Sequence, residues 1–166
     1  MEISHIAGLP AHALVVHAAV VLVPLSAVAF LALCWRPVWR RKYGLPIALL
    51  AVAGAVGAVL AASTGEPLAH TVRQAARASG GAARFGEHPE QGDTARLMAV
   101  LFAMTVAGFY AIVRWGERFR VPAWAGHATY AARAVIAILS TATMLVAGHS
   151  GAALVWRDVG TYVSNP

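Results

Sequence analysis

Four long stretches of apolar residues follow one another along the chain, separated by shorter polar segments. They cover approximately Ala13 to Trp35, Leu45 to Ser63, Leu97 to Trp115 and Ala128 to Val146, and the last can be extended to Trp156. A helix needs roughly 20 mainly apolar residues to cross a bilayer. The stretches are too long for strands and show no alternation. This pattern predicts an all-α fold, an integral membrane four-helix bundle.

The composition supports the same class of protein. The chain has 166 residues, of which 59% are hydrophobic and 12% are charged, whereas soluble domains have about 45–50% apolar and about 25% charged residues. A disordered chain is excluded and an ordinary soluble enzyme is disfavoured. The length fits a single domain, residues 1–166. With one cysteine, Cys34, the chain has no internal disulfide, no CxxCH haem attachment and no cysteine-rich metal site.

The basic residues are concentrated beside two of the three loops. The first and third loops and the adjoining span ends hold one acidic residue, Glu117, and eight basic residues: Arg36, Arg40, Arg41, Lys42, Arg114, Arg118, Arg120 and Arg133. The positive-inside rule places these loops in the cytoplasm. Both termini and the long loop from Thr64 to Arg96 between helices 2 and 3 are then outside. Because the basic residues occupy short turns beside the membrane, we do not expect nucleic-acid binding.

The long outer loop has local structure of its own. Glu66 and Pro67 can begin a short helix, since proline is favoured in a first helical turn. Leu68 and Val72 would share one face, which favours an interfacial amphipathic helix lying on the bundle over a lid. The small residues from Ala78 to Ala82 would end this helix.

Histidine is the informative polar residue, because no Asp, Glu, Lys or Arg lies near the middle of a span. His17 lies about one turn into the first helix and His149 lies near the outer end of the fourth. The two imidazoles could share a depth on different helices, as a clamped cofactor requires. Each could instead bond a backbone carbonyl. His12 and His88 are also on the outer side, where solvation by water and headgroups is the alternative.

Two other features each have two interpretations. Asp93 could fix the tautomer of His88, or it could cap the third helix. Small residues in the second span, including Gly54 and Gly57, could allow close helix packing or leave room for a flat macrocycle.

Several short motifs resemble one bacterial membrane-protein family, domain of unknown function 2231. The segment from Gly8 to His17 resembles its LPxHPxxVH entry, with Ala13 where the family often has proline. Thr64 to Leu68 resembles its loop signature, and Glu87 to Asp93 resembles its H-x-x-x-G-D element. The segment from Gly148 to Trp156 resembles its closing GHSGAxxVW motif.

The resemblance implies four helices, a polar outward end and a location in the bacterial cytoplasmic (inner) membrane. Some relatives are joined to Rieske iron–sulfur domains, which suggests electron transfer. The positions that match the family motifs are His12, His17, Glu66, His88, Asp93 and His149.

Three functions follow as hypotheses. The first is b-type haem binding for electron transfer with a redox partner protein or quinone. Its ligands would be His17 and His149, with His12 or His88 as substitutes, and its propionates would pair with Arg73, Arg77 or Arg157. The second is a zinc, iron or copper site built from His12, His17, Glu66, His88 and His149. The third is a non-catalytic accessory subunit of a membrane complex. No catalytic nucleophile is recognisable, so an enzyme is not predicted.

Overall fold

Four long helices make up the computed structural model, which describes residues 5–6, 9–116 and 123–156. The helices are α1 (Ala11–Trp35), α2 (Arg40–Ala78), α3 (His88–Trp115) and α4 (Ala123–Trp156). A short 3-10 helix, η1 (Pro37–Trp39), joins α1 to α2. Two-residue strands β1 (His5–Ile6) and β2 (Leu9–Pro10) pair antiparallel before α1. The predicted four-helix fold is confirmed.

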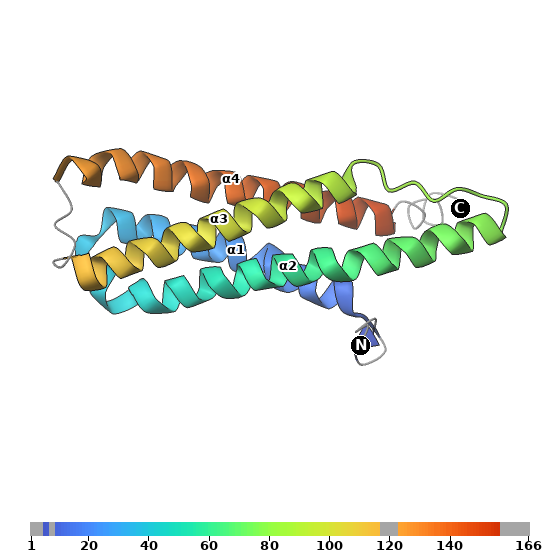
Figure 1. Ribbon diagram of the computed structural model, residues 1–166, viewed down its shortest axis with the longest axis horizontal. Coiled ribbons are helices and arrows are strands. Elements are labelled where there is room, and N and C mark those ends of the chain that lie inside the picture. The colour runs from blue at the N-terminus through green and yellow to red at the C-terminus, as the bar shows by residue number, and fades with distance from the viewer. Residues whose placement is uncertain (1–4, 7–8, 117–122, 157–166) are drawn as a thin grey trace, which may run out of the picture.

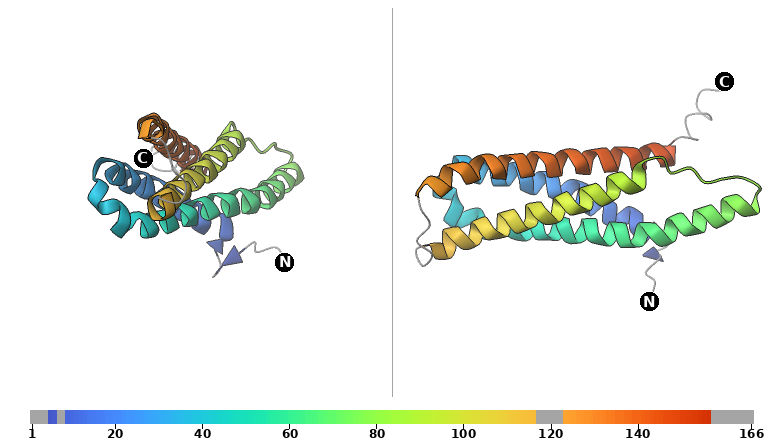
Figure 2. Two further views of the ribbon diagram at one scale, coloured as in Figure 1. Left: turned by 60° about the vertical axis from the view of Figure 1, so that its left-hand side comes forward. Right: turned by 45° about the horizontal axis from the view of Figure 1, so that its top comes forward.

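The helices form an elongated bundle with two distinct ends (Figures 1 and 2). Each helix packs against its neighbours in sequence, and α1 also packs against α4, so that α1 and α3 lie on one diagonal of the bundle. One end, which we call the histidine end, holds His12, His88 and His149. There α1 begins, α4 ends and residues 79–87 connect α2 to α3 (Figure 1). The opposite end, which we call the arginine end, holds Arg36, Arg40 and Arg114. There η1 joins α1 to α2, α3 ends and α4 begins.

The outer surface of the bundle is apolar. Each of the four helices is long and apolar enough to cross a membrane. Each also exposes more than half of at least one large apolar side chain, namely Val28, Leu49, Met104 and Ile138. Contiguous apolar surface of this kind is unfavourable in water and is covered by acyl chains in a bilayer. The chain is therefore a multi-pass membrane protein.

Small side chains hold α1 and α2 close together. A Cβ atom at Gly54 would lie 2.9 Å from Val23 Cγ2 and 3.1 Å from Val23 N, and one at Gly57 would lie 3.4 Å from Ala19 N. The backbone of α1 therefore occupies the space beside both glycines, as close packing between membrane helices requires. This supports the packing interpretation of the small residues in α2, since no room for a macrocycle remains beside them.

Substitution of Gly54 tests this packing. We expect Gly54→Leu to destabilise the bundle by about 1–3 kcal/mol, because the added side chain has no space against Val23. The measurement is thermal unfolding of the detergent-purified protein. The neighbouring Ala53 is exposed, so Ala53→Leu is the matched control and should unfold at the wild-type temperature. Equal unfolding temperatures for the two variants would contradict tight packing at Gly54.

Helix α2 is longer than expected, and the prediction of a separate interfacial helix from Glu66 and Pro67 is wrong. The helix continues through Pro67 to Ala78. Its last part, residues 64–78 (the α2 arm), projects past the start of α3 rather than lying on the bundle (Figure 1). Extending a formed helix needs no new nucleation, and the hydroxyl of Thr71 donates to the Pro67 carbonyl at 3.0 Å. As predicted, the helix ends before the small residues, where Gly80 has φ +75°.

Candidate paired-histidine site

His12 lies at the start of α1 and is anchored to α2. Its Nδ1 is 2.8 Å from the carbonyl oxygen of Ala61. A carbonyl oxygen only accepts hydrogen bonds, so Nδ1 must carry the hydrogen, which leaves a lone pair on Nε2 of the neutral ring. Gly65 lies one turn further along α2, and a Cβ atom there would be 3.0 Å from His12 Cε1. The missing side chain at Gly65 therefore makes room for the ring.

His88 has the same arrangement at the start of α3, with α4 as its support. Its Nδ1 is 2.9 Å from Ser150 Oγ. When the Ser150 hydroxyl donates to the Ala147 carbonyl, 3.1 Å away, its oxygen is available to accept the hydrogen of His88 Nδ1. The neutral ring again has its lone pair on Nε2. A Cβ atom at Gly151 would lie 2.9 Å from His88 Cε1, so this glycine also makes room for an imidazole.

Together the two histidines form a pair at the histidine end of the bundle. They lie at the starts of two diagonal helices, α1 and α3, at the same end of the bundle, and both are half-buried. A neutral imidazole whose Nδ1–H is hydrogen-bonded and whose Nε2 is free is the usual form of a histidine that binds a metal. The pair can therefore offer two nitrogen ligands from opposite sides of the bundle.

His17 and His149 lie elsewhere. Both side chains are exposed on the surface of the bundle. The Nδ1 of His17 bonds the carbonyl of Ala13, one turn earlier in the same helix, which is the backbone alternative considered for this residue. The two histidines whose rings are held against neighbouring helices at this end are thus His12 and His88, which the sequence offered as substitutes.

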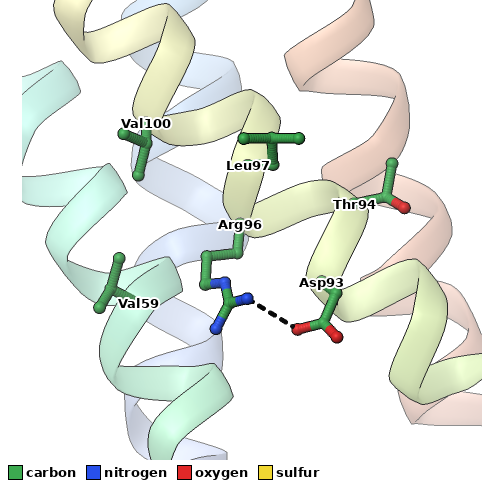
Figure 3. A pocket seen from close by; sticks show the side chains of 6 residues that line it. All are labelled: Val59, Asp93, Thr94, Arg96, Leu97 and Val100. Atoms are coloured by element: carbon green, nitrogen blue, oxygen red, sulfur yellow. Dashed lines mark ion pairs between the residues drawn. The ribbon is translucent and has the colours of Figure 1, made fainter.

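The acidic candidates also lie apart from the two imidazoles. Glu66 is exposed on the α2 arm. Asp93 forms an ion pair with Arg96, with Oδ1 and Nη2 3.2 Å apart (Figure 3). Helix α3 begins at His88 with Glu87 as its N-cap, so Asp93 lies inside the helix and the prediction that it caps α3 is wrong.

A shallow groove of about 580 Å³ lies between α2 and α3 beside this ion pair (Figure 3). The Asp93 and Arg96 side chains line its polar side, and Val59, Leu97 and Val100 supply apolar walls. The groove is open to the surface of the bundle.

A metal site with three or more protein ligands is not assembled in the part of the chain that the structure describes. No group of three His, Cys, Asp or Glu side chains converges among residues 12–116 and 129–156. Of the predicted propionate partners, Arg73 stacks on Phe85 with its Cζ 5.2 Å from the ring centroid. Arg77 is exposed on the α2 arm, and Arg157 lies outside the described residues.

The supporting residues were not predicted from the sequence. They are the Ala61 carbonyl, Gly65, Ser150 and Gly151. Three of them lie in segments that resemble family motifs: Gly65 belongs to the segment Thr64 to Leu68, and Ser150 and Gly151 follow His149 directly. Each of these stretches carries the family resemblance, which would have pointed to residues that position a ring as well as to the ring itself.

The fold and the site define a class, a multi-pass helical membrane protein with paired histidines at one end of its bundle. The chain belongs to the family DUF2231, described as predicted membrane proteins, and the match covers residues 8–164. The matched region includes both histidines and both glycines of the site. No curated protein and no solved structure matches the chain.

Proposed function

We propose that the protein binds b-type haem between His12 and His88 and serves in one-electron transfer. The observation that carries the proposal is the pair of imidazoles, each hydrogen-bonded through Nδ1, so that Nε2 is the ligand atom when the ring is neutral. Haem iron already has four nitrogen ligands in the macrocycle, so it needs only two from the protein. A zinc site takes three or four protein ligands, which fits a two-histidine site less well.

The residues around the pair have defined roles in this proposal. The Ala61 carbonyl and the Ser150 hydroxyl hold the rings in one tautomer and one orientation, which strengthens Nε2 as a ligand. Bundle cores commonly hold cofactors between side chains of facing helices. His12 and His88 would hold the haem, and a haem held by two histidines would supply one-electron transfer.

The proposal also includes an orientation. The positive-inside rule puts the arginine end in the cytoplasm and the histidine end outside the bacterial cytoplasmic membrane. Arg73 and Arg77 of the α2 arm would then supply charge-assisted hydrogen bonds to propionates on the outer side. A redox partner protein on the outer side, or a quinone in the membrane, would exchange the electron.

A visible absorption spectrum of the detergent-purified protein tests the proposal. After expression with added haem precursor, we expect a Soret band and, on reduction, sharp α and β bands. A folded but colourless protein would overturn the haem proposal. In that case, stoichiometric zinc, iron or copper in elemental analysis would favour a metal site. A metal-free protein that co-purifies with another membrane protein would favour an accessory subunit.

A further inference from the structure

Two arginines lie against the same aromatic rings at the arginine end of the bundle, at the opposite end from His12 and His88. Arg40 is the first residue of α2 and Arg133 belongs to α4. The Cζ of Arg40 is 5.7 Å from the ring centroid of Phe109 and 5.3 Å from that of Tyr130. The Cζ of Arg133 is 4.7 Å and 5.5 Å from the same two centroids. Both guanidinium groups therefore lie against the same two rings.

Among the side chains that the structure describes, no acidic residue neutralises the positive charges of these two arginines. Arg40 donates from Nε to the Leu33 carbonyl at 3.0 Å and from Nη2 to the Cys34 carbonyl at 2.8 Å. These bonds satisfy carbonyls in the last turn of α1 but bring no negative charge. Within residues 12–116 and 129–156, no carboxylate lies within ion-pair distance of either arginine; the ion pair found there joins Arg96 to Asp93.

Because the two guanidinium groups share these two rings, their positive charges lie near each other. Both side chains are half-buried, so water screens this repulsion less than it would at a free surface. Arg133 donates no hydrogen bond to the described residues, and its partners are the two aromatic faces. Two half-buried cations that have no acidic partner among the described side chains form an arrangement that an anion would complete.

From this arrangement we infer that Arg40 and Arg133 together form a binding site for a phosphate group. Guanidinium groups offer planar pairs of N–H donors that match the spacing of phosphate oxygens. The aromatic rings hold the two guanidinium groups in place by cation–π contact. The carbonyls of α1 fix Arg40 further, so that less freedom is lost on binding. The site lies at the end of the membrane helices, where both lipid phosphates and soluble phosphates have access.

Binding is measured on the intact, purified protein with two kinds of probe. One is nanodiscs of phosphatidylcholine with and without phosphatidylglycerol, with lipid retention read by native mass spectrometry. The other is inorganic phosphate added in detergent, with the unfolding temperature as readout. Retention of phosphatidylglycerol alone identifies a lipid headgroup as the ligand. A rise in unfolding temperature with inorganic phosphate identifies soluble phosphates. If neither probe binds, the inference is overturned.

Variants test whether the two arginines are responsible. We expect Arg133→Gln to weaken binding about tenfold or more, because a charge-assisted contact is lost. Arg114→Gln is the matched control, since Arg114 is a basic residue of the same end whose Cζ lies 6.0 Å from the ring of Trp115. It should bind as the wild type does. Arg133→Lys keeps the charge and protects the test against misfolding, and it should bind with intermediate affinity. Equal losses of binding in Arg133→Gln and Arg114→Gln would mean that phosphate is attracted by the general positive charge of this end, and would overturn the inference.

Discussion

Replacement of His88 by alanine is expected to remove the Soret band of the purified protein, and His12→Ala should do the same. Each variant deletes one of the two nitrogen ligands in the proposed site, and the hydrogen bond of each ring to Ser150 or Ala61 is lost with it. A macrocycle held by one remaining histidine would be weakly bound or lost during purification. The measurement is haem content per protein, from the reduced absorption spectrum.

The controls for this prediction come from the same end of the molecule. His17→Ala and His149→Ala remove the two exposed imidazoles, so both variants should keep the full Soret band. All four variants should show the same helical circular dichroism as the wild type. Loss of haem in His17→Ala and His149→Ala, with retention in His12→Ala and His88→Ala, would move the site to the surface pair and refute the one proposed here.

Valine in place of Gly151 is the second change with a large expected effect. A Cβ atom at this position would lie 2.9 Å from Cε1 of His88 and 3.4 Å from its Nε2, so the ring must move. Changes to residues that orient a ligand typically reduce affinity about 10- to 100-fold, and we expect a loss of haem affinity in this range. Gly65→Val should act in the same way, through Cε1 of His12. Haem titration of the apoprotein measures the effect.

Substitutions at two other glycines distinguish displacement of the His88 ring from a general loss of helix packing. A Cβ atom at Gly92 would meet no atom within 4 Å, so Gly92→Val should bind haem normally. A Cβ atom at Gly148 would lie 3.1 Å from Val20 Cγ2, so Gly148→Val disturbs the contact between α1 and α4 without touching a histidine. If Gly148→Val lost as much haem affinity as Gly151→Val, packing rather than the position of the His88 ring would explain the effect.

The helices were largely predictable because a membrane leaves few alternatives for long apolar stretches. Backbone groups in a bilayer must bond internally, so such stretches form helices. The error occurred at Pro67, outside the apolar stretch, where hydropathy gives no information. Pro67 has no backbone N–H, so one hydrogen bond of the helix is missing there. This loss does not end a helix that is already formed, and α2 continues to Ala78.

The site was less predictable because hydropathy does not report how a helix is rotated. His12 and His17 differ by about 140° around a helix, so at most one of them can face the interior, but the sequence alone did not show which. The structure half-buries His12 and exposes His17. The support of His88 by Ser150 depends on the contact between α3 and α4 across a separation of 62 residues, which no local pattern contains.

The close contact between α1 and α2 has a consequence for the biogenesis of the protein. These two helices are joined by the short η1, their glycine contacts lie within one hairpin, and Arg40 caps the carbonyls of α1. The hairpin can thus assemble as soon as the translocon has released its second segment. His88, by contrast, takes its orientation from Ser150 near the end of α4. The histidine pair is completed only after synthesis of the last helix, so loading with a prosthetic group would be post-translational.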